Sequence, residues 1–546
     1  MTRGSGIASD PATPLGCRTD RLTDMCDTLA GSYNLNASPF PGVFGTSAST
    51  CGLKNDDPSG AQPRRDRQAV AAGLGSVDRI AQRQGLSLLC FKTQMRRPRL
   101  RLCAACTYVD KFTTFVNGYR YKKNNEAMIK SIHIQNFRVI KELHYECAAG
   151  MNVVVGVNGA GKTTLLSALV MLLSWFRARM VNSNGRGLPL TDNDITYGED
   201  FCLLEITLTD GTEWKMYKQR SSNRDSPKTK SEYSSLSDKV NNLLRDFENR
   251  GHSISLPIIA YYGIQRAVDV PMYLHTWKNV SPLHIYSGKL DGRANFRGFF
   301  EWFRTREDIE NQERLNSTLT YRDKQLEAVR RAVHKALPQY GELKVHRGPQ
   351  YFYMEKSDGV KHRFEQFSDG EKCYITLFSD IARMLAIANP SLDNPLDGEG
   401  VVIIDEVDLH LHPAWQMKVI GILRGLFPNC QFFISTHSPI VTTNVDVSND
   451  DKLLVARNGE ITPTSEKIFG REVDGILLDL FGMETLRNEE VQGYIDQIWS
   501  LLQVGDYESE EFDGYLGLLE NLLPDDDPEF SRINQQIALL KSQPSL

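Results

Sequence analysis

Residues 152–155 form a short apolar run that leads directly into a glycine-rich segment, 156–163, and then into an apolar stretch with helical character. The segment fits the pattern G-x-x-x-x-G-K-T, in which glycines let backbone N–H groups surround phosphates at the start of a helix. A strand, a glycine-rich turn and a helix in this order predict an α/β fold with a nucleotide at the turn. The expected contacts are Asn158, Gly159, Gly161, Lys162, Thr163 and Thr164, with Lys162 reaching the β- and γ-phosphates and Thr163 ligating Mg²⁺.

A second apolar run, 401–404, is rich in β-branched residues and ends in the paired acids Asp405 and Glu406. Such a run predicts a buried parallel strand, and α/β folds place their sites at the carboxyl ends of these strands. We expect Asp405 to hold Mg²⁺ through water and Glu406 to act as general base for the attacking water. The alternative interpretation is an ordinary pair of acids where a strand meets a loop.

A third apolar run, 431–434, is followed by the segment Ser-Thr-His-Ser-Pro at 435–439, which contains His437. An imidazole that follows a buried strand in this way, among hydroxyl groups and before a proline, could contact a γ-phosphate and respond to its loss. A lone histidine is more often structural, and that alternative stays open at the level of sequence.

The segment Ser-Asp-Gly-Glu at 368–371 precedes a predicted helix at 374–387. Its position upstream of the acid pair suggests that Ser368 and Gly370 face the γ-phosphate held by an opposite protomer. A plain capping box is the alternative, because Ser368 as helix cap with Glu371 three residues later fits that pattern as well.

Composition sets only broad limits. The chain has 546 residues, with 41% hydrophobic and 24% charged residues, which is ordinary for a globular protein of more than one domain. The net charge of -5 gives no global attraction to nucleic acid or to a membrane. No uninterrupted apolar run approaches the ~18 residues of a spanning helix, and the N-terminus lacks the layout of a secretory signal. We therefore expect a cytoplasmic protein with no membrane partner.

Residues 1–127 differ in character from the rest of the chain, because they are rich in Gly, Pro, Ser, Thr and Ala and lack a sustained period. We expect a poorly ordered extension, or sequence translated upstream of a start at Met128. Basic clusters at 95–101 and 119–123 leave a nucleic-acid-binding arm as the alternative. A lone C-x-x-C pair at 103–106 has no second pair at zinc-ribbon spacing, so we expect no metal there.

The remaining chain divides into four predicted parts. They are an N-terminal lobe with the glycine-rich loop (128–225), a helical insert (226–345), a C-terminal lobe with the other three segments (346–470) and an acidic helical tail (471–546). Periodicity predicts strands at 129–134, 137–145, 152–155, 201–208, 213–218, 351–354, 401–404, 431–434 and 453–455, and helices at 163–176, 231–248, 298–337 and 374–387. An apolar stripe in the tail, 491–502, would pack within the tail or against a partner.

With these segments in view, the stretch 130–437 resembles the ABC-type ATPase heads of structural-maintenance-of-chromosomes, RecF and overcoming-lysogenization-defect proteins. Ser-Asp-Gly-Glu-Lys at 368–372 is similar to their signature motif, and Ile-Gln-Asn-Phe-Arg at 134–138 to their opening strand. The resemblance implies an α/β ABC-type ATPase head, in which a P-loop mixed sheet is joined by an antiparallel β subdomain. This head would carry the helical insert and the C-terminal helical tail. It also implies ATP and Mg²⁺ in composite sites of a head-to-tail dimer or a larger homo-oligomer.

The same resemblance implies roles for three further residues. Gln265 would be the Mg²⁺-sensing glutamine of a Q-loop, and Arg138 would contact nucleotide phosphates. His412 occupies the position where chromosome-maintenance heads carry the D-loop aspartate. Signalling between protomers through that aspartate is therefore not assumed for this chain.

Three segments, 302–311, 326–330 and 470–474, together with the acidic tail, are similar to the PtuA ATPases of Septu and retron antiviral systems. This resemblance implies an HNH endonuclease of the PtuB type as partner, and in a retron also a reverse transcriptase with its RNA–DNA product. Overcoming-lysogenization-defect proteins carry a Toprim nuclease after the ATPase. Here the acids at 525–527 follow a predicted helix rather than a strand, which favours a solvated loop over a metal site.

The sequence thus predicts a bacterial antiviral ATPase that hydrolyses ATP in composite dimer sites and thereby controls an associated HNH endonuclease. One alternative is a DNA-repair clamp of the SMC or RecF kind, which binds DNA directly and hydrolyses ATP in response. A self-contained nuclease is the other alternative, and it needs an acid cluster that the sequence does not provide.

Overall fold

The computed structural model describes residues 128–220, 230–264, 281–288, 290–447 and 451–542. The predicted extension at 1–127, with its basic clusters and its C-x-x-C pair, lies outside the described residues. The same holds for Gln265, so its predicted role stays a prediction.

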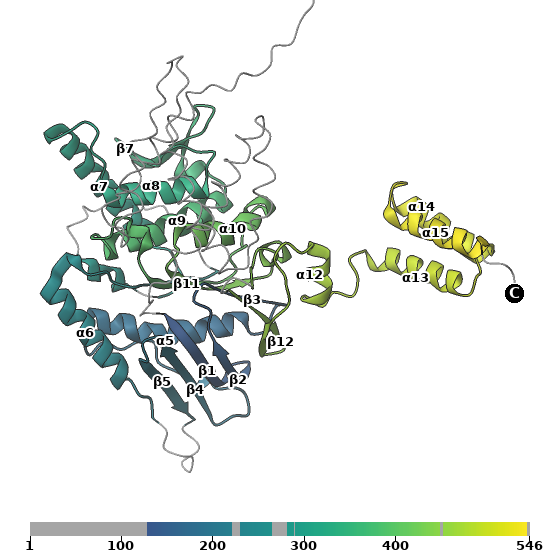
Figure 1. Ribbon diagram of the computed structural model, residues 1–546, viewed down its shortest axis with the longest axis horizontal. Coiled ribbons are helices and arrows are strands. Elements are labelled where there is room, and N and C mark those ends of the chain that lie inside the picture. The colour runs from purple at the N-terminus through teal and green to yellow at the C-terminus, as the bar shows by residue number, and fades with distance from the viewer. Residues whose placement is uncertain (1–127, 221–229, 265–280, 289, 448–450, 543–546) are drawn as a thin grey trace, which may run out of the picture. The chain divides into compact units, whose positions relative to one another are not determined.

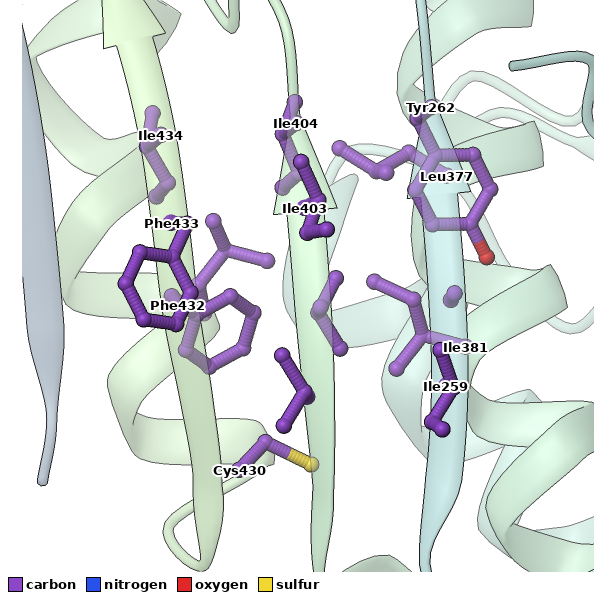
Figure 2. Close-up of a cluster of buried hydrophobic side chains, with 14 of the residues drawn as sticks. Ile259, Tyr262, Leu377, Ile381, Ile403, Ile404, Cys430, Phe432, Phe433 and Ile434 are labelled. Carbon is purple, nitrogen blue, oxygen red and sulfur yellow. The ribbon is translucent and has the colours of Figure 1, made fainter. Parts of the chain in front are cut away.

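A six-stranded central sheet has the order β13-β12-β3-β11-β10-β6. Its strands are β3 (Met151–Gly156), β6 (Ile258–Tyr262), β10 (Gly400–Ile404), β11 (Cys430–Thr436), β12 (Lys452–Arg457) and β13 (Glu460–Thr464). All neighbours are parallel except β12 and β13. Every residue of β3, β10 and β11 is buried, as expected for parallel strands covered on both faces. Figure 2 shows how the apolar side chains of β10 and β11 lie beside those of β6.

The second sheet is antiparallel, and its four strands, β2-β1-β4-β5, lie side by side in Figure 1. Their bounds are β1 (Ile129–Phe137), β2 (Ile140–Glu146), β4 (Phe201–Leu208) and β5 (Glu213–Gln219). Burial alternates along β4, so one face of this sheet is apolar and packed while the other faces outward.

Helix α5 (Lys162–Val181) follows the glycine-rich loop and contacts strands of both sheets. Trp214 of β5 donates its indole N–H to the backbone oxygen of Leu172 in α5, at 3.1 Å. Within the described residues, α5 is the one helix long and apolar enough to cross a membrane by length and composition, and 67% of its most apolar window is buried in protein. Its apolar character is therefore explained by its place in the core.

The insert consists of helices and a small sheet. Its helices are α6 (Ser234–Arg250), α7 (Phe296–Asn316) and α8 (Lys324–Ala336), and the sheet β7-β8-β9 comprises Lys344–Arg347, Gln350–Glu355 and Lys361–Arg363. Phe352 of β8 is buried and packs in edge-on contacts against the rings of Phe300 and Phe303 in α7, at 4.2 and 5.3 Å between centroids.

Two predictions for this part are wrong. A single helix at 298–337 is replaced by α7 and α8, because the Asp323 carboxylate accepts the backbone N–H of Leu326 at 2.8 Å and so caps a new helix. The stretch 226–345 is also not wholly helical, since it supplies strand β6 to the edge of the central sheet.

The C-terminal lobe contributes the helices α9 (Asp369–Ala388), α10 (Pro413–Leu426), α11 (Pro439–Thr442) and α12 (Val473–Asp479). Leu377 and Ile381 of α9 point toward the central sheet in Figure 2.

Short 3-10 helices occur at η3 (Asp192–Asp194), η4 (Gly251–Ser253), η5 (Pro282–Tyr286), η6 (Phe364–Gln366) and η7 (Pro395–Asp397).

The tail forms three helices, α13 (Glu489–Gln503), α14 (Glu510–Leu522) and α15 (Pro528–Ser542). Its predicted apolar stripe packs within the tail: Ile495, Ile498 and Leu502 share a hydrophobic cluster with Phe512, Leu519 and Ile533. Asp527 of the acidic loop pairs with Arg487, whose guanidinium donates to it at 2.7 and 3.0 Å.

Together these elements confirm the predicted fold class, an α/β head with a mixed parallel sheet, an antiparallel β subdomain, an insert and a helical tail. Because parallel strands end at the same edge of a sheet, the residues that follow β3, β6, β10 and β11 meet along one edge.

Candidate active site

The predicted site residues lie after three neighbouring strands of the central sheet. The glycine-rich loop follows β3, the acid pair follows β10, and His437 follows β11, which lies between them. The Thr163 hydroxyl is 3.3 Å from a carboxylate oxygen of Asp405, and Nε2 of His437 is 3.9 Å from a carboxylate oxygen of Glu406. Segments far apart in the sequence therefore form one group of side chains.

The glycine-rich loop depends on backbone conformations and on space that only glycine supplies. Gly156, Gly159 and Gly161 have positive φ angles of 147°, 78° and 110°. A Cβ on Gly156 would also lie 2.2 Å from the backbone oxygen of Ala456 in β12. Asn158 at the tip of the loop is exposed.

Lys162 is 5% exposed, and its ammonium donates to the backbone oxygens of Gly156 and Val157, both at 2.9 Å. Burial lowers the pKa of Lys162, while the negative charges of Glu406 and Asp405 oppose that change. Thr164, the neighbour of Thr163, is partly buried at the start of α5. The charged end of Lys162 is thus held at the loop, close to the acid pair.

The acid pair is fixed by a serine of the neighbouring strand. Ser435 of β11 donates its hydroxyl hydrogen to the buried Asp405 carboxylate, and its oxygen accepts the backbone N–H of Glu406 at 2.8 Å. Glu406 has a φ of 49°, in the left-handed region that side chains other than glycine seldom adopt. This backbone turn separates the two acids: the side chain of Asp405 is buried at the strand end, whereas that of Glu406 is 25% exposed.

Asp408 holds the loop that carries His437. One of its carboxylate oxygens accepts the hydroxyl of Thr436 and, at 3.3 Å, the backbone N–H of His437. The Thr436 oxygen in turn accepts the backbone N–H of Ser438 at 2.9 Å. Burial first, and then the charge of Lys162, lower the pKa of His437, although nearby carboxylates act in the opposite direction. The surroundings of His437 therefore favour the neutral form of its imidazole.

Sequence reasoning did not identify Ser435 or Asp408. Both were visible as polar residues near predicted site residues, Ser435 directly after an apolar run and Asp408 two positions after the acid pair. Their partners could not be inferred without the order of the strands in the sheet.

Ser368 and Gly370 lie elsewhere, at the N-terminus of α9. The exposed Ser368 forms the capping box that the sequence left open as an alternative: its hydroxyl accepts the N–H of Glu371 at 3.3 Å, and Glu371 accepts the N–H of Ser368 at 2.9 Å. Gly370 is buried, and a Cβ there would lie 2.4 Å from the backbone oxygen of His410. The hydroxyl of Ser368 also lies 2.9 Å from the Glu371 carboxylate, so these two residues bond to each other at the start of α9.

Two residues named by resemblance have clear structural partners. Arg138, in the turn between β1 and β2, donates its side chain and its backbone N–H to Asp194 of η3, at 3.0 and 2.8 Å. His412 caps α10, because its Nδ1 accepts the backbone N–H of Ala414 at 3.2 Å.

The residues predicted to hold Mg²⁺ fit that ion chemically. Thr163 and Asp405 offer a hydroxyl and a carboxylate oxygen, the hard ligands that Mg²⁺ prefers. Mg²⁺ usually keeps several of its waters, so a carboxylate can hold it through one of them. The two oxygens lie 3.3 Å apart, close enough for Thr163 to be a ligand and for Asp405 to contact the ion through a bound water.

A family model described as "AAA domain, putative AbiEii toxin, Type IV TA system" matches residues 151–443. The chain is 28% identical over 451 residues to the "Retron Vc95 probable ATPase" of Vibrio cholerae serotype O1 biovar El Tor, covering 71% of this chain and 86% of the relative. It is 26% identical over 421 residues to the "Retron Ec83 probable ATPase" of Escherichia coli, covering 66% and 77%. To the "Septu protein PtuA" of Bacillus thuringiensis it is 32% identical over 120 residues, covering 21% and 30%. These relatives confirm the predicted resemblance to PtuA-type ATPases.

Proposed function

The chain belongs to the AAA domain family that matches it over residues 151–443, and from this premise we propose that it is the ATPase subunit of a retron or Septu-type antiviral system. Family membership implies ATP binding. The observation that supports hydrolysis best is the group formed by Lys162, Thr163, Asp405, Glu406 and His437 at one edge of the sheet.

In this proposal, Lys162 leaves the loop oxygens and contacts the β- and γ-phosphates of ATP, while the N–H groups of the loop surround them. Thr163 and, through water, Asp405 would hold Mg²⁺, and the bound ion would neutralise charge on the phosphate oxygens. Glu406 orients and deprotonates the attacking water as general base. The neutral His437 accepts or donates a hydrogen bond near the γ-phosphate.

We propose further that each site is completed by a second copy of the chain. Ser368 is exposed at the start of a helix of the C-terminal lobe, where its hydroxyl bonds to Glu371 of the same helix. A helix N-terminus favours an anion, so the α9 terminus of one protomer is suited to the triphosphate held by its partner. This arrangement gives a head-to-tail dimer with two composite sites, or a larger assembly of such dimers.

Mixed dimers test the composite site. Ser368→Asp keeps a good helix cap but adds a negative charge that would face the γ-phosphate, and Lys162→Ala removes the phosphate contact. Each variant alone is expected to be inactive in ATP hydrolysis. Random mixing of the two restores one intact site in half of the dimers, so about 25% of the wild-type rate is expected.

The matched control mixes Lys162→Ala with the double variant Lys162→Ala/Ser368→Asp, which creates no intact site. An inactive first mixture, or wild-type activity of Ser368→Asp alone, would show that one subunit encloses the nucleotide by itself.

The partners proposed are an HNH endonuclease and, in a retron setting, a reverse transcriptase with its RNA–DNA product, all in the cytoplasm. Their support is the similarity to retron and Septu proteins. Affinity purification of Glu406→Gln, which is expected to keep ATP and the closed dimer, tests this directly. Recovery of an HNH protein supports the proposal. Its absence, together with ATP hydrolysis stimulated by duplex DNA, supports a DNA-binding clamp instead.

A further inference from the structure

Two histidines and two glutamates gather on the outward face of the antiparallel sheet, outside the residues assigned above. His133 of β1 is in register with His144 of β2 on one side and with Glu205 of β4 on the other. Glu142 lies two positions before His144 and therefore on the same face of β2. The two imidazole rings stack, with centroids 3.8 Å apart and planes inclined by 16°. The fold thus places four metal-ligand side chains in one cluster.

The two imidazoles are arranged around one carboxylate oxygen. Oε1 of Glu142 is 2.8 Å from Nε2 of His133 and 3.1 Å from Nε2 of His144. The candidate ligand atoms of these three residues all lie within 4.8 Å of one another. Around four-coordinate zinc, ligand atoms lie about 3.3–3.4 Å apart, since each is about 2.0–2.1 Å from the ion. Small side-chain movements would bring all three onto a single ion.

A second carboxylate, that of Glu205, lies beside the other ring nitrogen of His133. Oε2 of Glu205 is 3.5 Å from Nδ1 of His133, the ring nitrogen that does not face Glu142. A histidine that ligates a metal usually donates its other ring N–H to a carboxylate, which fixes the tautomer and the ring orientation. Such a carboxylate is present here.

We propose that His133, His144 and Glu142 bind a transition-metal ion of the zinc class, with Glu205 as a positioning residue. The fourth coordination position is open to water, because the side chains of Glu142 and His144 are 48% and 69% exposed. Two imidazole nitrogens select zinc, cobalt or nickel over Mg²⁺, so this site is chemically distinct from the oxygen site at Thr163 and Asp405.

Metal titration of the full-length protein tests the proposal. The protein is first treated with a chelator and then titrated with Co²⁺ or Zn²⁺ in excess Mg²⁺, using calorimetry and cobalt absorption. The wild-type protein is expected to bind one equivalent of Co²⁺ that shows d–d absorption but no thiolate-to-cobalt band. The missing band distinguishes this site from one made of cysteines. His144→Ala should lose that single equivalent, and Glu205→Gln should weaken its affinity about 10- to 100-fold.

His346→Ala is the matched control, since His346 is an exposed histidine on β7 outside the cluster. Unchanged circular dichroism and ATP affinity show that each variant is folded. The same cobalt stoichiometry and affinity in wild type and His144→Ala, or no cobalt binding by wild type in excess Mg²⁺, would overturn the proposal. Because the titration contains no hydrolysis step, its outcome is independent of the proposed ATPase mechanism.

Discussion

Replacing Asp408 with alanine tests how the His437 loop is held in position. The carboxylate accepts two hydrogen bonds, one from the Thr436 hydroxyl and one from the His437 backbone N–H, and both are lost in Asp408→Ala. Hydrogen bonds to a charged acceptor contribute about 1.5–3 kcal/mol each, although water can replace part of this at a half-buried residue.

A net loss of about 2 kcal/mol lowers the equilibrium constant for the ordered loop roughly 30-fold, since 1.36 kcal/mol is a factor of ten. We therefore expect ATP hydrolysis by Asp408→Ala to be slower than wild type by up to about 30-fold. ATP affinity should change little, because the ammonium of Lys162 is held by the backbone oxygens of Gly156 and Val157, and Asp408→Ala leaves both hydrogen bonds in place.

Phosphate release under saturating ATP and binding of a fluorescent ATP analogue measure the two quantities separately. Asp408→Asn is the matched control: it keeps an acceptor oxygen but loses the charge, so its rate should fall less than that of Asp408→Ala. Wild-type hydrolysis by Asp408→Ala would refute the reasoning. Equal loss in both variants would assign the effect to the charge of Asp408 and not to its hydrogen bonds.

Three further predictions concern the pKa of His437, the close packing at Gly370 and the buried ring of Phe352. Lys162→Ala should raise the pKa of His437 in an NMR titration, because it removes a positive charge that disfavours the imidazolium. In the wild-type protein the pKa of His437 is lowered, so the unfolded chain binds this proton more readily than the folded chain. His437 therefore makes stability fall as pH falls below about 6.5. Gly370→Ala should lower the free energy of unfolding in urea by about 1–3 kcal/mol, because its Cβ meets a backbone oxygen, whereas Gly421→Ala, with open space around the Cβ, should not. Phe352→Ala should cost about 3–5 kcal/mol in the same assay, since the buried ring contacts several others, and a cost below 1 kcal/mol would contradict this.

The strands that end in functional segments could be predicted from sequence because their signal is local. The runs at 401–404 and 431–434 are apolar, short and followed at once by polar residues, and the structure confirms both as buried strands. Strand β6 was not predicted, although Ile258–Tyr262 is equally apolar, because it stands among segments with helical character. A run of only five apolar residues shows no periodicity that would distinguish a strand from part of a helix.

The residues that support the candidate site could not be predicted from sequence, for a different reason. Ser435 and Asp408 act on residues of a neighbouring strand or loop, and β11 lies between β3 and β10 although it follows both in the sequence. Such pairings depend on strand order, which no local pattern encodes. The roles of all the predicted site residues, including Ser368, Gly370 and Gln265, stay predictions.

The backbone of Glu406 has a consequence for how the protein can be inactivated. Holding a residue other than glycine in the left-handed region costs about 1–3 kcal/mol, and here the hydroxyl of Ser435 accepts the N–H of that residue. Alanine at position 435 would leave strand β11 apolar and intact but would release the peptide group of Glu406 to a more relaxed conformation. A chain could thus keep Lys162, Glu406 and His437 and still lose the orientation of the Glu406 carboxylate through one substitution on the adjacent strand.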